Sequence, residues 1–133
     1  AVIHFKGTCD VADLASTDAY PGPLGWTHMS DGEILPFSDI NCDGVRLFTQ
    51  RELLRIPEAG REVVYGRAIA RVLAHELYHI FAKTTKHAAW GIGKPAYSVQ
   101  DLLSNKFLFE KKQCDLLKAH QAHLESISGE GGQ

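Results

Sequence analysis

Hydrophobic and polar residues follow two different periods along the chain. Near its start, short runs rich in β-branched and aromatic residues, such as AVIHF at residues 1–5, are typical of strands. Between residues 61 and 83, apolar side chains instead recur at the ~100° per residue of an α-helix and share one broad arc. That arc comprises Val63, Ile69, Ala70, Leu73, Leu77, Ile80 and Phe81. The pattern predicts a β-rich first part followed by a helical remainder.

The stretch LGWTHMSDGEILPFSDI predicts a β-hairpin. Asp31 and Gly32 form a dipeptide that is favoured in tight hairpin turns, and they separate the candidate strands 26–29 and 34–40. Pro36 lies in the second strand and has no N–H to donate to a neighbouring strand. We therefore expect this second strand to lie at the edge of a sheet or to carry a bulge.

Shorter helices are predicted by other local signals. FTQRELLRI at residues 48–56 fits a short helix that ends before Pro57. Ser98 and Asp101 have the spacing of a capping box, which marks the start of a helix. Residues 109–124 fit a last helix.

These elements predict one domain with an α+β fold. We expect a small, mostly antiparallel sheet whose edge strand packs on a central helix, followed by a helical C-terminal region. Residues 1–57 would form the β-rich part and residues 61–83 the central helix. Residues 84–133 would form a loop and the C-terminal helices.

Composition and charge narrow the classes of partner. The net charge of −2 and the scattered basic residues give no electrostatic reason to expect nucleic acid or an anionic membrane as partner. No apolar run approaches the roughly 20 residues that span a bilayer. The chain begins with Ala, which favours a secreted protein from which a leader or pro-segment has been removed. We expect it to be a monomer.

The cysteines form no C-x-x-C pair, which excludes a zinc ribbon. In a secreted protein two of them would pair. Cys9 and Cys42 each follow a candidate strand and are the preferred pair, which would leave Cys114 as a thiol. The alternative is that all of them are reduced and buried.

The segment HELYH at residues 75–79 places possible metal ligands on the central helix. His75 and His79 lie one turn apart, so both imidazoles can reach one cation at Zn–N distances of roughly 2.0–2.1 Å. Glu76 lies ~100° further round the helix, where it fits a general base better than a ligand. Because the predicted apolar arc leaves this face free, we expect it to line a cleft. The alternative is a polar seam on an ordinary helix.

A catalytic zinc needs a third protein ligand, and His87 is the leading candidate. On a straight helix this residue would lie ~18 Å along the axis from the first histidine. The helix must therefore end near Lys83, and the chain must fold back. Glu110, Asp101 and Cys42 remain as competing third ligands.

HELYH on an apolar helix after a hairpin resembles the active-site motif of the zincin metallopeptidases. The resemblance implies a sheet, an active-site helix and a following region that supplies the last ligand. It also implies that His75 and His79 bind zinc and that Glu76 is the general base. Zincin substrates usually lie extended along an edge strand, which here would be residues 34–40.

The subfamily stays open. A histidine after the helix is similar to the metzincin pattern H-E-x-x-H-x-x-G-x-x-H, and His87 stands two residues beyond the last position of that pattern. Ala82 occupies the glycine position and Thr85 the histidine position. The downstream gluzincin pattern and the deformylase motifs are also missing from the sequence.

Two functions are compatible with these residues. The first is a zinc-dependent metallopeptidase that hydrolyses peptide bonds through a zinc-bound water, with Glu76 as general base. Its partner would be a peptide or protein substrate, and a pro-segment or inhibitor could silence the site. The alternative is a non-catalytic zinc-binding or interaction domain, in which Cys42 or Glu110 closes the coordination sphere.

Other polar residues have both a functional and a structural interpretation. Tyr97 could donate a hydrogen bond to a developing oxyanion, or it could pack against the core with its hydroxyl at the surface. Arg67 and Arg71 could orient a substrate carboxylate, or they could form a solvated helix edge. His4 and His28 lie on candidate strands without an evident partner.

Overall fold

The protein is described here by a computed structural model. It describes residues 1–15, 22–87, 91–92, 96–105, 109 and 111–131, with the backbone alone from residue 122. Three strands and four helices follow one another in these parts of the chain. They are β1 Val2–Lys6, β2 Gly25–Ser30, β3 Glu33–Asn41, α1 Cys42–Leu53, α2 Glu58–Ala82, α3 Val99–Leu103 and α4 Lys111–Gly131. The α+β prediction is confirmed.

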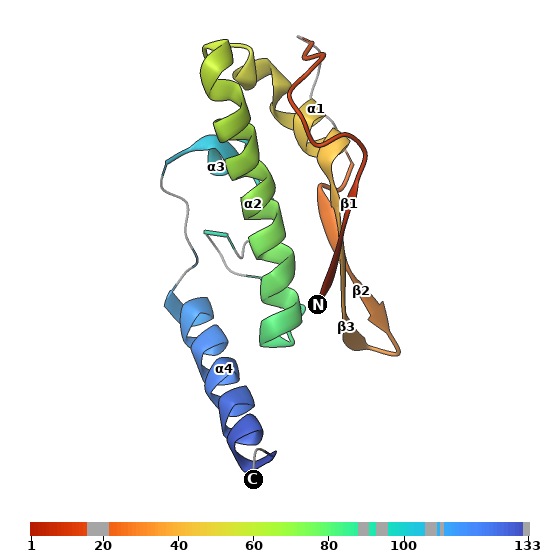
Figure 1. The fold of residues 1–133 in the computed structure, drawn as a ribbon, viewed down its shortest axis with the longest axis vertical. Coiled ribbons are helices and arrows are strands. Elements are labelled where there is room, and N and C mark those ends of the chain that lie inside the picture. Colours follow the sequence, from red (N-terminus) through yellow and green to blue (C-terminus); the bar gives the residue numbers. More distant parts are fainter. Residues whose placement is uncertain (16–21, 88–90, 93–95, 106–108, 110, 132–133) are drawn as a thin grey trace.

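The sheet has the order β1-β3-β2 and is mixed (Figure 1). β2 and β3 form the predicted antiparallel hairpin, and Asp31 and Gly32 turn it with φ angles of 50° and 77°. β1 pairs with β3 in parallel, from Val2 opposite Phe37. The expectation that residues 34–40 form an edge strand is therefore wrong, because β3 pairs with β1 on one side and with β2 on the other. The two edge strands are β1 and β2, and residues of β2 line a cleft together with His75, His79 and His87.

Pro36 is accommodated by an irregularity in the strand pairing. The β2–β3 register shifts between Thr27 and Met29, so the residues around Pro36 leave the regular ladder. The parallel pairing with β1 begins only at Phe37. The bulge, which was one of the two alternatives for this proline, is what the structure contains.

α1 begins six residues before the predicted position. The side chain of Asn41 accepts a hydrogen bond from the backbone N–H of Gly44 at 2.9 Å and caps the helix. Cys42, the first residue of α1, forms the predicted disulfide with Cys9, and Cys114 is a free thiol. The disulfide therefore ties the segment after β1 to the start of α1.

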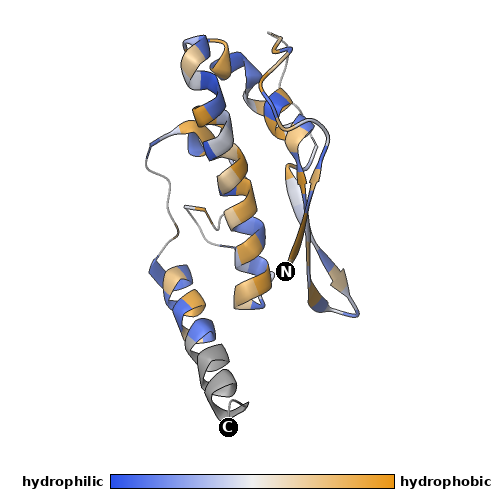
Figure 2. Ribbon diagram, viewed as in Figure 1, coloured by the Kyte–Doolittle hydropathy of each residue, from blue (hydrophilic) through white to orange (hydrophobic). Residues whose placement is uncertain are grey.

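α2 is the central element, and it runs alongside the sheet in Figure 1. α1 packs at its N-terminal half, while α4 lies beyond its other end. Figure 2 shows hydrophobic residues concentrated along the middle of α2, and a hydrophilic turn at the tip of the hairpin. The buried core joins Ile40, Val45, Leu53, Tyr65, Ala68, Val72 and Leu102. No described helix is long and apolar enough to cross a membrane.

The C-terminal helices follow the chain's local signals. Ser98 and Asp101 form the predicted capping box of α3. Arg71, which is buried, donates to the carbonyl oxygens of Asp101 and Leu102 at 3.1 and 2.8 Å, and Arg67 donates to Leu103 at 2.9 Å. These arginines therefore hold α3 against α2, and the expectation of a solvated edge or a substrate contact is wrong for Arg71. α4 extends to Gly131, beyond its predicted end.

Candidate metal centre

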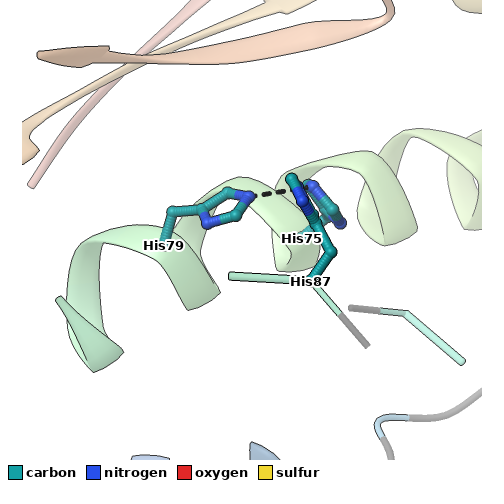
Figure 3. Close-up of side chains that lie close together, drawn as sticks. All are labelled: His75, His79 and His87. Carbon is teal, nitrogen blue, oxygen red and sulfur yellow. Dashed lines mark hydrogen bonds between the residues drawn. The ribbon is translucent and has the colours of Figure 1, made fainter. Parts of the chain in front are cut away.

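His75, His79 and His87 lie close enough together to hold one metal ion. One nitrogen from each ring lies within 4.8 Å of the others. The Nε2 atoms of His75 and His79 are 3.0 Å apart. In Figure 3 their rings extend from consecutive turns of α2 toward each other, and the ring of His87 lies beside them. The three candidate ligands from the sequence are therefore brought together.

The turn that delivers His87 has the form that the sequence analysis required. α2 ends at Ala82, and Lys83 adopts the left-handed conformation with φ 53° and ψ 46°. Its backbone N–H donates to the carbonyl of His79, as in a helix C-cap. The chain reverses there, so residues 84–87 run back beside the last turns of α2.

The competing ligands lie elsewhere or outside the described residues. Cys42 is bonded to Cys9 and has no thiolate to offer. Asp101 accepts from the backbone of Ser98 in the α3 capping box. Glu110 lies outside the described residues. Within the described part of the chain, no other histidine, cysteine or carboxylate joins the cluster.

The hydrogen bonds of the two helical histidines orient their ring nitrogens. His79 Nδ1 lies 2.7 Å from the carbonyl oxygen of Thr84, and His75 Nδ1 lies 2.8 Å from that of Ile92. A carbonyl oxygen only accepts, so each Nδ1 must carry the hydrogen. This leaves each Nε2 directed at the other ring, and the two Nε2 atoms lie 3.0 Å apart, within hydrogen-bonding distance. In neutral rings, both Nε2 lone pairs would be available to one cation.

Tyr97 touches the same hydrogen-bonding group. Its hydroxyl lies 2.7 Å from His75 Nδ1 and donates to the carbonyl of Ile92. If the hydroxyl donated to His75 instead, the unprotonated Nδ1 would face the Ile92 carbonyl at 2.8 Å, lone pair against lone pair. The tautomer with its hydrogen on Nδ1, which leaves Nε2 available to a metal, is therefore the one that donates to the Ile92 carbonyl oxygen. Tyr97 shares its acceptor, the Ile92 carbonyl oxygen, with the candidate ligand His75, and the expectation of a hydroxyl at the surface is wrong.

Burial lowers the pKa of two of the candidate ligands, His75 and His87, and so favours the neutral form that binds metal. His75 and His79 are each 8% exposed, whereas His87 is exposed. Burial lowers the pKa of His75 to about 4. The pKa of His87 is lowered as well, first by desolvation and then by the nearby His79. At neutral pH, His75 and His87 therefore offer lone pairs rather than positive charge.

Glu76 points from α2 toward the sheet. It is 6% exposed, and its Oε2 accepts a hydrogen bond of 2.8 Å from the hydroxyl of Thr27 on β2. Thr27 in turn lies 2.7 Å from the hydroxyl of Ser38 on β3. Burial raises the pKa of Glu76, and the hydrogen bond from Thr27 opposes that rise. A carboxylate with a raised pKa next to a metal centre is suited to accept a proton.

Thr27 and Ser38 were not predicted as functional residues. The available signal was strand alternation, which places Thr27 on the face of β2 opposite to Trp26 and His28. A threonine on the inward face of a short strand is also common in ordinary sheets, so this signal is weak.

Glu76 lines two clefts. One of about 320 Å³ is lined by His75, His79, His87 and residues of β2 and β3. Another of about 440 Å³ includes Tyr97. The two share His75, Glu76 and Gly25, so the candidate centre lies where they meet.

Gly25 sets the distance between β2 and α2. A Cβ atom at this position would lie 2.9 Å from Val72 Cγ1, 3.2 Å from the Asp39 carbonyl oxygen and 3.3 Å from Glu76 Cγ. These distances are too short for a side chain in a packed interior. The missing side chain is what allows the strand to approach Glu76.

The buried face of α2 differs from the predicted one. Val63, in the predicted apolar arc, is 68% exposed. Tyr65, Ala68 and Val72 are buried instead, and at three- and four-residue spacings the same stripe continues through His75. The expectation that the histidine face lines a cleft is confirmed, but that face is not separate from the core. One face of α2 packs in the core over its first half and carries the candidate metal ligands over its second half.

His4 and His28, expected to lack partners, share the buried carboxylate of Asp39. His4 Nδ1 lies 3.1 Å from Asp39 Oδ1, and His28 Nε2 contacts Oδ2. The hydrogen bond from His28 is the main cause that lowers the pKa of Asp39. This group links the three strands.

Comparison of the chain with protein-family models, with curated proteins and with solved structures found no match. Any assignment of function therefore depends on the geometry and chemistry of the residues themselves.

Proposed function

We propose that the chain is a zinc-dependent metallopeptidase of the zincin type. The observation that carries the proposal is the position of Glu76 beside three converging imidazoles, in a cleft bounded by an edge strand. A simple structural histidine cluster would not need a buried carboxylate held by a hydroxyl next to it. The disulfide supports the expected secreted location.

The donor set suits zinc. Nitrogens bound to one tetrahedral zinc at ~2.0–2.1 Å lie about 3.3 Å apart. The 3.0 Å between the Nε2 atoms of His75 and His79 is close to this distance. The Nδ1 atom of each ring is already bonded to a backbone carbonyl, an arrangement that fixes metal-binding histidines. With three ligands among the described residues, a fourth position is open to water or substrate.

A bound zinc would supply Lewis-acid chemistry, since it lowers the pKa of water toward ~7 and polarises a carbonyl group. Glu76 would accept the proton of the attacking water on its carboxylate and deliver it to the leaving amine nitrogen. The buried surroundings, which raise the pKa of Glu76, bring its proton affinity nearer to that needed at neutral pH. An extended peptide would lie along β2, whose residues line the cleft.

The alternative function, a non-catalytic zinc site, would need Cys42 or Glu110 as a fourth ligand. Cys42 is in a disulfide and cannot bind zinc. Glu110 lies outside the described residues. The alternative therefore remains a non-catalytic binding domain, which would hold metal without turnover.

The decisive experiment combines metal analysis with a peptide-cleavage assay. We expect one zinc per chain, and hydrolysis of some members of a mixed peptide library. Glu76→Gln should keep the zinc and lose hydrolysis, because the amide cannot accept the proton. Glu62→Gln, at an exposed position of the same helix, is the matched control and should behave as the unmodified protein.

Three results would count against the proposal. A purified chain that binds no zinc would exclude the metal centre. Zinc without hydrolysis would favour the non-catalytic domain. Full turnover in Glu76→Gln would remove this residue from the mechanism.

A further inference from the structure

We propose that Thr27, backed by Ser38, is a positioning residue that fixes the Glu76 carboxylate for proton transfer. The inference rests on the proposed peptidase function. It assigns a role to two hydroxyl groups of the sheet that would otherwise belong to ordinary strand packing. Neither residue touches the candidate metal ligands in any described contact.

The direction of the hydrogen bonds follows from the groups involved. Thr27 has one hydroxyl hydrogen, and its Oγ1 lies 2.8 Å from Glu76 Oε2 and 3.3 Å from the backbone oxygen of the same residue. The shorter, charge-assisted contact takes the hydrogen. Ser38, at 2.7 Å, then donates to Thr27 Oγ1. The result is a series of two hydrogen bonds that runs from Ser38 through Thr27 to the Glu76 carboxylate.

The sheet holds this series of hydrogen bonds in a fixed geometry. Thr27 and Ser38 are directly paired residues of β2 and β3, and Ser38 is 2% exposed. Thr27 is β-branched, so its side chain has few rotamers on a strand. Gly25, two residues before it, allows β2 to approach α2 closely enough for the contact. The hydroxyl is therefore held by the fold before any substrate binds.

The position of the bond suits a proton-transfer group. Glu76 lines both clefts, so this residue lies where they meet. Without a donor, a buried carboxylate has an uncompensated charge and free rotation about its last torsion. A hydrogen bond to Oε2 removes both problems at once. An exposed glutamate with several rotamers would spend only part of its time in the reactive geometry.

The first test compares Thr27→Val with Thr27→Ser, each measured for zinc content, kcat and KM on a peptide that the unmodified chain cleaves. Valine has nearly the same shape and no hydroxyl, so kcat should fall by about 10- to 100-fold at unchanged zinc content and similar KM. Serine restores the hydroxyl and should keep kcat within about threefold of the unmodified chain. Thr49→Val is the matched control, since Thr49 is also buried and donates to Val45 within α1, away from the site.

A second test needs neither metal nor activity. In the zinc-free protein, Thr27→Val should lower the urea midpoint of unfolding, because it leaves the buried Glu76 without its donor. The same substitution should have a much smaller effect in a Glu76→Leu background, where no carboxylate needs the donor. Equal effects in both backgrounds would show that the contact does not exist in solution. If Thr27→Val fails to fold, Ser38→Ala provides the milder version of both measurements.

The two proposals fail in distinguishable ways. An unmodified chain that cleaves no peptide would end the peptidase proposal, and the positioning role with it, even if the unfolding cycle showed coupling. An active chain whose Thr27→Val variant keeps its kcat would overturn only the positioning role. A fall in kcat that serine does not restore would assign Thr27 a packing role instead.

Discussion

The buried imidazole of His75 predicts a loss of stability in mild acid. In the folded chain, burial lowers its pKa from 6.5 to about 4. The unfolded chain exposes the same ring, which takes up a proton near pH ~6.5. A pKa change of this size corresponds to about 3 kcal/mol of folding free energy once His75 is protonated in both the unfolded and the folded state.

The sign follows from which state binds the proton first. Above pH ~6.5 His75 is unprotonated in both the folded and the unfolded chain, so it does not make the free energy of unfolding depend on pH. As the pH falls through 6.5, the unfolded state gains a proton while the folded ring stays neutral, so stability decreases. The decrease is about 2.5 kcal/mol by pH ~4.5 and levels off below the folded pKa of about 4. Asp39, whose pKa is lowered, acts only below its ordinary value of 3.8 and therefore outside this interval.

Glu76 acts in the opposite direction. Burial raises its pKa, so the folded state binds this proton more readily than the unfolded state. Protonation of Glu76 in mild acid therefore offsets part of the loss caused by His75. The two residues can be separated by substituting each with glutamine.

The assay is urea unfolding of the zinc-free protein in EDTA at pH 7.5 and pH 4.5. The unmodified chain should lose stability between these values, and His75→Gln should lose about 2.5 kcal/mol less. Glu76→Gln should lose more than the unmodified chain, because the offsetting residue is gone. If His75→Gln and the unmodified chain show the same loss, the imidazole is not buried and neutral, and the arrangement of the ring nitrogens is wrong.

Three other substitutions or treatments test the elements around the site. Lys83→Gly should raise stability by about 1 kcal/mol in thermal unfolding, because glycine adopts the left-handed conformation without strain; an unchanged or lower midpoint would contradict the turn. Reduction of Cys9–Cys42, which closes a loop with a sequence separation of 33, should cost about 3–4 kcal/mol in urea unfolding, and no change would exclude the bond. Arg71→Met should cost about 2 kcal/mol and speed amide exchange in α3, since two helix-terminal carbonyls lose their buried charged donor; unchanged exchange would show that α3 is held otherwise.

The local parts of the fold could be predicted from the sequence. The Asp31-Gly32 turn, the long α2 helix and the capping box at Ser98 each depend on residues that are neighbours along the chain. The pairing of β1 with β3 does not, because nothing in residues 1–6 specifies a parallel partner more than thirty residues away. The early start of α1 was missed for a different reason. The predicted helix began at Phe48, whereas the cap at Asn41 determined the boundary.

The buried face of α2 was mispredicted for a related reason. Its large aliphatic residues do define an amphipathic arc, yet they pack only in part against the core. The smaller residues Ala68 and Val72 face the sheet, because β2 and β3 approach the helix closely there. Side-chain size along one helix cannot reveal how near another element comes. The histidines consequently continue the buried face of α2, beside the cleft that residues of β2 and β3 also line.

The candidate ligands were predictable because a single helix fixes most of their geometry. The spacing of His75 and His79 determines their relative position whatever surrounds them, and His87 needed only a reversal of the chain after Lys83. The groups that contact His75 and Glu76 come from elsewhere: Tyr97 from a later segment and Thr27 from the sheet. Their contacts depend on how sheet and loop dock on α2, which no local pattern encodes.

The same distinction bears on what turns an H-E-x-x-H segment into a site. The motif supplies ligands and a carboxylate on any exposed helix, where Glu76 would be solvated and free to rotate. In this chain Gly25 lets β2 press against α2, which buries Glu76 and brings Thr27 within 2.8 Å of its carboxylate. A Cβ atom at position 25 would lie 2.9 Å from Val72 Cγ1 and 3.3 Å from Glu76 Cγ, so the strand or its neighbours on the helix would have to shift. Under the proposed function, Gly25→Ala should therefore weaken the Thr27–Glu76 contact and leave zinc binding by His75, His79 and His87 unchanged. Loss of zinc and hydrolysis together in that variant would show instead that the strand also determines the metal site.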